Sequence, residues 1–139
     1  MLTEDDIIEG VRDVLAAQGW ELVSRATASQ RGDDLVMRRG DVSLVVEAKG
    51  AGSSKPGTAR YGSPFNRGQV FDHVAKAILK ALRVASAGDG KAGVAFPDNA
   101  DHRREVDQVR PALTSAGIVV FWVDDNGRVR TDGDDAWLS

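Results

Sequence analysis

Residues 34–49 read DLVMRRGDVSLVVEAK, and this stretch decides the fold because two short apolar runs flank a polar turn. The first run is residues 35–37, and the second lies within residues 42–46. Short valine-rich runs bounded by turn residues are typical of strands. Gly40-Asp41 favours a two-residue hairpin loop of type II′, whose first central position needs the positive φ that glycine adopts freely. The stretch therefore predicts two antiparallel strands joined by a tight turn.

The register of this hairpin brings two acidic residues together. With Gly40-Asp41 as the loop, Asp34 lies directly opposite Glu47, and the two side chains start about 5 Å apart. Strand alternation puts Glu47 and Lys49 on one face of the sheet. Two carboxylates this close repel each other, so a bare pair would hold a proton or a cation. The hairpin therefore predicts a metal site with a lysine beside it.

The chemistry of these groups suits hydrolysis of phosphodiester bonds. Asp34, Glu47 and the backbone carbonyl of Ala48 offer oxygen ligands, which favour Mg²⁺ or Mn²⁺ over zinc. Such an ion makes a bound water nucleophilic and neutralises charge on the phosphoryl oxygens. Lys49 would orient that water or stabilise the charged transition state. The alternative is an ordinary surface hairpin with a Glu/Lys pair, because a Glu-x-Lys tripeptide alone is common.

The chain resembles the PD-(D/E)xK, or restriction-endonuclease-like, nuclease superfamily. The resemblance lies in Asp34, within Gly32-Asp33-Asp34-Leu35-Val36, and in Glu47-Ala48-Lys49. The predicted order of elements, αβββαβαβ over roughly residues 3–130, is similar to that of the family. Asp33 stands where the family name has proline, and Asp34 matches the motif because it directly precedes the apolar strand. The resemblance implies an α/β fold with a mixed central sheet flanked by helices, and an Mg²⁺-dependent deoxyribonuclease whose core is Asp34, Glu47 and Lys49.

Length and composition agree with one such domain. The chain has 139 residues, a formal net charge of −3 and no cysteine, so it has neither disulfides nor thiolate metal sites. No apolar run is long enough to span a membrane, and the acidic opening residues are unlike a secretory leader, so we expect a cytoplasmic protein. We predict a single domain over residues 1–130 and an acidic C-terminal tail over residues 131–139. The negative charge is unusual for a nucleic-acid-binding protein, which generally needs a local basic surface.

The remaining elements are predicted from periodicity and turn signals. Thr3 is a predicted N-cap, with Asp6 completing a capping box. Pro111 is predicted to kink the third helix. The predicted elements are a helix over 3–19, a strand over 20–26, a loop over 50–66, a helix over 68–87, a strand over 92–96, a helix over 99–117 and a last strand over 118–123. Helices between strands predict a mixed sheet covered on both sides.

Many members of the superfamily add a glutamate from the first helix to the metal site. Glu4 lies on the apolar face of the predicted helix with Ile8 and Val11, so it could point toward the sheet. Glu9 lies nearly opposite and is predicted to be solvated. The sequence leaves open whether either residue joins the site.

The second helix supplies a further candidate. Gln69 is similar to a glutamine that helps to organise the active site or bind phosphate in resolvase-like and recombination-nuclease branches of the superfamily. His73, Lys76 and Lys80 share its helical face, which we predict to be an ordinary solvated surface. The opposite face is predicted to be buried and consists of Val70, Phe71, Val74, Ile78, Ala81 and Leu82.

Basic residues near the second helix are candidates for binding a nucleic-acid backbone. Lys55, Arg60 and Arg67 are interleaved with Tyr61, Phe65 and Asn66, a mixture that suits phosphate contacts and base stacking. Lys76 is a further candidate. The alternative is a soluble loop that happens to be basic. His102, Arg103 and Arg104 are predicted to lie on the surface.

The sequence thus predicts an endonuclease that hydrolyses DNA with the help of Mg²⁺ or Mn²⁺, through Asp34, Glu47, Lys49 and Gln69. A catalytically silent nucleic-acid- or protein-binding module on the same fold is the alternative. A nuclease subunit of a larger defence or repair complex is a third reading. Cutting two strands would call for a homodimer. The sequence does not show whether the substrate is DNA or RNA.

Overall fold

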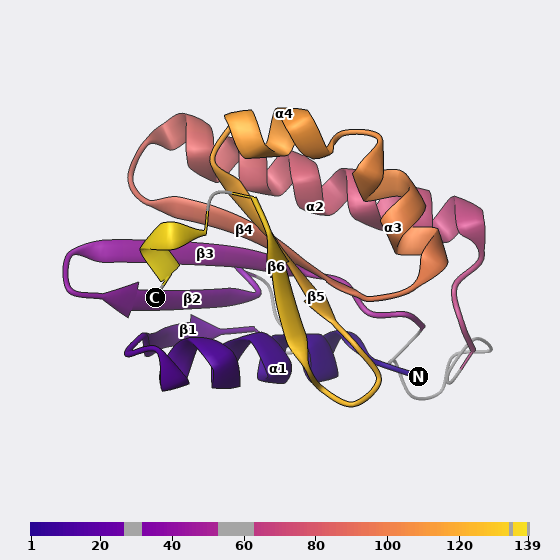
Figure 1. Cartoon of the computed structure of the whole chain (residues 1–139), viewed down its shortest axis with the longest axis horizontal. Helices are drawn as coiled ribbons and strands as arrows, with labels where there is room; N and C mark the ends of the chain where they lie inside the picture. The colour runs from indigo at the N-terminus through magenta and orange to yellow at the C-terminus, as the bar shows by residue number, and fades with distance from the viewer. Residues whose placement is uncertain (27–31, 53–62, 134, 139) are drawn as a thin grey trace.

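The computed structural model describes residues 1–26, 32–52, 63–133 and 135–138. Within these residues, six strands form one sheet in the order β1-β2-β3-β4-β5-β6. The central pairs β3–β4 and β4–β5 are parallel, and the outer pairs are antiparallel. Helices lie on both faces of the sheet, so the predicted α/β architecture with a covered mixed sheet is confirmed (Figure 1).

The elements follow one another as α1 (Glu4–Ala17), β1 (Glu21–Arg25), β2 (Leu35–Arg39), β3 (Val42–Ala48), α2 (Arg67–Ala87), β4 (Lys91–Pro97), α3 (Ala100–Asp107), α4 (Arg110–Ser115), β5 (Ile118–Val123), β6 (Val129–Asp132) and the short 3₁₀ helix η1 (Ala136–Leu138).

The β2–β3 hairpin has the predicted register. Leu35 pairs with Val46, and Arg39 pairs with Val42 on either side of the turn. Gly40 has a φ of 59°, whereas Asp41 does not have a positive φ. A type I′ turn needs positive φ at both central residues, so this loop fits type II′. One step beyond the Leu35–Val46 pair, the same register places Asp34 opposite Glu47.

Two apolar cores lie on opposite faces of the sheet. The α1 helix covers one face with Ile7, Ile8, Val11 and Leu15, whereas α2, α3 and α4 cover the other (Figure 1). Along β3, Val46 and Ala48 belong to the core under α1. Strand alternation therefore turns Glu47, which lies between them, toward α2.

Both long helices begin at a capping box. The Thr3 hydroxyl accepts a hydrogen bond from the Asp6 N–H, and the Asp6 carboxylate accepts one from the Thr3 N–H, as predicted. Asn66 and Gln69 make the equivalent pair at the start of α2. These reciprocal bonds satisfy backbone donors that a helix N-terminus otherwise leaves unpaired.

The predicted buried face of α2 is partly wrong. Val70, Val74 and Ala81 are buried as expected, but Phe71 is 56% exposed and Leu82 is 38% exposed. The buried stripe is therefore rotated away from Phe71 and Leu82 relative to the prediction.

The C-terminal third departs further from the prediction. The expected single helix with a kink is two helices, and Pro111 lies in the first turn of α4, where its missing N–H leaves no hydrogen bond unmade. A sixth strand, β6, pairs antiparallel with β5. Leu138 is 5% exposed and its carbonyl accepts a hydrogen bond from the Trp20 indole at 2.8 Å. The expected boundary at residue 130, with a separate acidic tail over 131–139, is therefore wrong.

No helix among the described residues is both long enough and apolar enough to cross a membrane.

Candidate functional site: a carboxylate pair

The carboxyl groups of Asp34 and Glu47 lie together at the end of the β2–β3 hairpin. Their side chains share a hydrogen bond. Asp34 Oδ2 also accepts a hydrogen bond from the backbone N–H of Ala48 at 2.8 Å, which ties the residue before β2 to the end of β3. Glu47 is only 2% exposed. The two acids that the sequence predicts to face each other therefore do so, with one of them inside the protein.

The surroundings of Glu47 favour its protonated form. Burial, followed by the charge of Asp34 and the hydrogen bond that the protonated Glu47 carboxyl donates to Asp34, raises the pKa of Glu47 to about 8. The nearby Lys80 opposes this shift, but less strongly. Without a bound cation, Glu47 therefore holds a proton near neutral pH. The sequence predicts that a bare pair holds either a proton or a cation, and the raised pKa corresponds to the proton.

Of the lysines near the end of β3, Lys80 approaches the pair most clearly. Lys49 directly follows β3, two residues after Glu47. Its backbone N–H donates to the carbonyl of Ala95 at 3.0 Å, which holds this end of β3 against β4. Lys80, from α2, places its Nζ 3.7 Å from Glu47 Oε2. The sequence predicts a solvated face for Lys80, and its side chain is 50% exposed, but its ammonium group also reaches Glu47.

The start of α1 lies against the same end of β3. Gly50 touches the backbone of Thr3 and Glu4 so closely that a Cβ at this position would lie 2.5 Å from the Glu4 nitrogen. The Ala51 N–H donates to the Leu2 carbonyl at 2.7 Å. Burial and the charge of Asp34 raise the pKa of Glu4, whereas the charge of Lys49 lowers it. Glu4 is therefore the first-helix glutamate that lies near the pair.

Glu9, the other acid on α1, lies in a different environment. It forms ion pairs with Arg25 of β1 and with Arg12. These two arginines already neutralise it.

Gln69 takes part in the start of α2. Its side-chain oxygen accepts a hydrogen bond from the Asn66 N–H at 2.9 Å, so the capping box uses this oxygen. A glutamine at this position therefore has a structural role, and its predicted part in the active site stays a prediction.

His73 lies one turn after Gln69 and is half-buried. Its ring lies edge-on to that of Phe65, with centroids 4.4 Å apart. Burial and the charges of Lys49 and Lys76 lower the pKa of His73. The α2 face that bears His73 is therefore partly covered, whereas Lys76 and Lys80 on the same face are exposed.

The structure describes two of the four candidate phosphate-binding residues, Arg67 and Lys76. Lys55 and Arg60 lie outside the described residues. The Arg67 side chain is 74% exposed and lies 3.6 Å from Asp101. Lys76 is exposed.

Two residues that the sequence assigns to the surface have internal roles. His102 is 1% exposed, and its Nδ1 lies 2.8 Å from the Asn99 side-chain oxygen. Burial lowers the pKa of His102 to about 4, so the ring is neutral. Arg103 binds Asp98 with two hydrogen bonds and stacks on Trp122. The predicted place on the surface is therefore wrong for His102, whereas the Arg103 side chain is 30% exposed.

The donor set at the pair can be compared with what a divalent ion requires. Among the described residues, no three His, Cys, Asp or Glu side chains are placed to hold a metal. Mg²⁺ commonly takes one or two carboxylates and completes its shell with waters and substrate phosphate oxygens. Glu47 Oε2 is buried and has no hydrogen-bond partner among the described groups. The two carboxylates therefore fit a magnesium site that relies on water and substrate, but not one enclosed by protein side chains.

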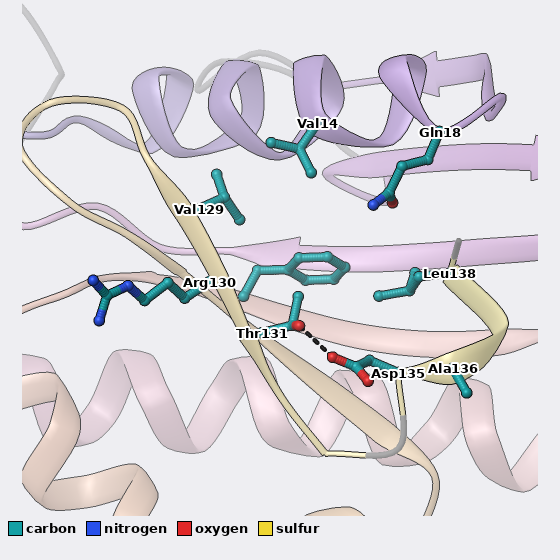
Figure 2. Close-up of a pocket in the computed structure, with 9 residues that line it drawn as sticks. Val14, Gln18, Val129, Arg130, Thr131, Asp135, Ala136 and Leu138 are labelled. Atoms are coloured by element: carbon teal, nitrogen blue, oxygen red, sulfur yellow. Dashed lines mark hydrogen bonds between the residues drawn. The ribbon is translucent and has the colours of Figure 1, made fainter.

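A cavity of about 420 Å³ lies elsewhere, between the end of α1, the β5–β6 hairpin and η1 (Figure 2). Val14, Val129 and Leu138 give it apolar walls, and the Thr131 hydroxyl donates to Asp135 at its edge. None of the acids or lysines of the pair lines it.

Comparisons with known proteins place few limits on the function. No protein-family model matches the chain, and no curated protein matches it either. Among solved structures, the chain is similar to the structure of Pyrococcus furiosus SfsA in complex with Ca²⁺, with a TM-score of 0.43 and 15% sequence identity. The match covers 89% of this chain and 58% of that chain. The function therefore has to be argued from the side chains of this protein.

Proposed function

We propose that this protein is a metal-dependent endonuclease of the PD-(D/E)xK type, which hydrolyses DNA phosphodiester bonds. One observation carries the proposal: a buried Glu47 is held against Asp34, with the ammonium group of Lys80 3.7 Å from Glu47 Oε2. Burying a carboxyl group beside another acid is costly, and such perturbed groups are concentrated at functional sites. A mixed six-stranded sheet with helices on both faces is compatible with the proposal.

Each residue has a distinct part in the proposed reaction. Asp34 and Glu47, with the Ala48 carbonyl, would hold Mg²⁺ or Mn²⁺. A bound ion of this kind supplies a nucleophilic water and neutralises phosphoryl charge. Lys49 would orient the attacking water or stabilise the charge of the transition state. Gln69 would position the phosphate from the start of α2, and Arg67 and Lys76, together with Lys55 and Arg60, would bind the backbone.

Cleavage assays with substituted proteins test this proposal. The purified protein is incubated with supercoiled plasmid, a four-way DNA junction and single-stranded RNA, in Mg²⁺, Mn²⁺ or EDTA. We expect metal-dependent cutting that falls at least about a hundredfold in Asp34→Asn, Glu47→Gln and Lys49→Ala. Asp33→Asn is the matched control, because Asp33 is an exposed acid next to Asp34, and it should cut normally. Cutting that persists in the Asp34 and Lys49 variants would assign the activity to another site or to a contaminant.

A second candidate is a catalytically silent module on the same fold, which binds nucleic acid or protein. The absence of a third carboxylate or histidine ligand among the described residues, and the net charge of −3, favour it. A silent nucleic-acid-binding module would bind DNA in EDTA, with an affinity that falls steeply with salt, and would never cleave it. A nuclease subunit would differ from both by cutting DNA only after a partner or a second copy is added.

A further inference from the structure

Lys80 makes an unusual contact with the carboxylate pair. Its side chain is 50% exposed, whereas its partner Glu47 is 2% exposed. The long aliphatic stem thus carries an ammonium group from the solvent side of α2 to a carboxyl group inside the protein. The Lys80 ammonium group therefore lies beside the pair, on the side that faces α2.

The contact is loose enough to be broken. The distance from Lys80 Nζ to Glu47 Oε2 is 3.7 Å, which is longer than a hydrogen bond, and Glu47 Oε2 has no hydrogen-bond partner among the described groups. Arg103 and Asp98 show what a fixed pair looks like in this protein, with two hydrogen bonds of 2.8 and 3.0 Å. An ammonium group on a flexible stem acts as a movable point charge, so Lys80 can leave the pair without breaking other described bonds.

We propose that Lys80 is an internal counter-cation of the Asp34–Glu47 pair, which competes with a divalent ion for the pair and, once displaced, binds a backbone phosphate of the nucleic acid. This inference rests on the proposed function, because it assigns Lys80 a role in that site: Lys80 moves from the carboxylate pair to a backbone phosphate. A divalent ion and an ammonium group repel each other, so they cannot both stay beside the same carboxylate oxygen. The displaced ammonium, already half in solvent, is then available to a phosphodiester, which lysine recognises as a point charge.

Metal binding without nucleic acid tests the first half of this inference. Mn²⁺ is titrated calorimetrically into the native protein, Lys80→Gln, Lys80→Arg and Asp34→Asn. Lys80→Gln should bind Mn²⁺ about fivefold more tightly, because the competing charge is gone. Lys80→Arg should stay close to the native protein, and Asp34→Asn should lose the site. Lys76→Gln is the matched control: it removes a lysine from the same helical face without an ion pair to Glu47, so its Mn²⁺ affinity should not change.

The salt dependence of DNA binding tests the second half. Affinity for a phosphorothioate duplex that resists cleavage is measured by fluorescence anisotropy over a range of salt, in Mn²⁺ and in EDTA. In Mn²⁺, the slope of log K against log[salt] should be smaller by about one for Lys80→Gln, which is the loss of one phosphate contact. In EDTA, the native protein and Lys80→Gln should have the same slope, because Lys80 then stays beside the carboxylate pair. A purely structural ion pair would not make the slope depend on the metal.

The outcomes separate this inference from the proposed function. Unchanged or weaker Mn²⁺ binding by a folded Lys80→Gln protein, or equal salt slopes in Mn²⁺, overturns the role of Lys80 even where DNA is cut normally. Tighter Mn²⁺ binding by Lys80→Gln, together with the metal-dependent change in slope, supports the role of Lys80 even if neither protein cuts DNA. Absence of cutting would instead contradict the proposed nuclease activity. Failure of both proteins to bind Mn²⁺ would overturn the two together. Circular dichroism and thermal melting show whether each variant is folded.

Discussion

The raised pKa of Glu47 should make the stability of the protein depend on pH. Its carboxyl group is buried beside Asp34, and its pKa is raised from 4.5 to about 8. Between these two values the folded protein holds a proton that the unfolded chain has released. The free energy of unfolding of the metal-free protein should therefore be highest at the acidic end of this range and fall as the pH rises to about 8.

Urea unfolding in EDTA at a series of pH values measures this effect. Glu47→Gln replaces the protonated carboxyl with a neutral amide of similar shape, so its stability should lose this dependence on pH. Asp33→Asn, the exposed neighbour, should keep it. Equal slopes for the native protein and Glu47→Gln would show that another group titrates.

Divalent ions should counteract the loss of stability that the metal-free protein shows as the pH rises. Both carboxylates must be ionised to hold an ion, so binding of Mn²⁺ requires the proton on Glu47 to leave. We expect Mn²⁺ affinity to increase as the pH approaches about 8, and Mn²⁺ to restore the stability lost there. Calorimetric titrations in two buffers with different heats of ionisation count the released protons. Binding that releases no proton would place the ion away from Glu47, and chelation with EDTA should return the protein to its metal-free stability.

The sequence predicts some site residues better than others for a physical reason. Asp34 and Glu47 meet through a two-residue turn, so local turn chemistry and strand alternation are sufficient to pair them. Lys80 reaches Glu47 only because of the rotation of α2 about its own axis, which depends on how α2 packs against the sheet, α3 and α4. Apolar periodicity alone assigns Phe71 and Leu82 to the buried face and Lys80 to solvent. Glu4 likewise reaches the site through tertiary contact at Gly50.

At the scale of elements, Gly50 joins α1 to the end of β3. A Cβ here would lie 2.5 Å from Glu4 N and 2.7 Å from Thr3 C, both of which are backbone atoms that cannot rotate away. We expect Gly50→Ala to destabilise the fold by about 2 kcal/mol or more, and to weaken Mn²⁺ binding because β3 and α1 must separate. Urea unfolding and calorimetry measure the two effects.

Gly68 provides the matched control for this substitution. It lies in α2, and a Cβ there would meet only the Asn66 side chain at 3.5 Å. Gly68→Ala should be neutral or stabilising, since alanine favours a helix more than glycine does. An equally mild effect at Gly50 would mean that the junction between α1 and β3 is adaptable.

The elements that the sequence misses have weak or ambiguous local signals. Residues 129–132 read VRTD, which is too polar and too short to stand out as a strand, and pairing with the wholly buried β5 gives them their conformation. Pro111 is compatible with either a kink or a helix start, and the sequence around it does not distinguish the two. Tertiary contacts decide both cases.

At the scale of the whole molecule, the C-terminal segment closes the core under α1. Leu138 is buried, its carbonyl accepts hydrogen bonds from Trp20 and Arg39, and the Trp137 ring lies edge-on to that of Trp20. We expect Leu138→Ala to cost about 2–5 kcal/mol, the usual range for a buried leucine. Leu79→Ala is the control, because Leu79 is 51% exposed, and it should cost far less. Similar urea midpoints for the two variants would show that η1 is not part of the cooperative fold.

The general architecture is predicted better than its edges. Alternating helical and strand periodicities are sufficient to predict a mixed sheet with helices on both faces, because each apolar face must be covered. The assignment of residues 131–139 to a tail fails because β6 pairs with β5, and the Leu138 carbonyl bonds to Trp20 and to Arg39 of β2, contacts that no local pattern encodes.

The tight turn at Gly40-Asp41 also affects the order of events during folding. An isolated hairpin closes within about 1–10 μs, whereas parallel pairing of β3 with β4 must wait for the long α2 crossover. The acids of β2 and β3 therefore meet before the ammonium of Lys80 arrives to balance them. Early collapse should then be hindered by their repulsion whenever both are ionised. Stopped-flow refolding of the native protein should accelerate in mild acid, and Glu47→Gln should refold at a rate that acid does not change. A native rate independent of pH would mean that the hairpin closes only after the central strands have assembled.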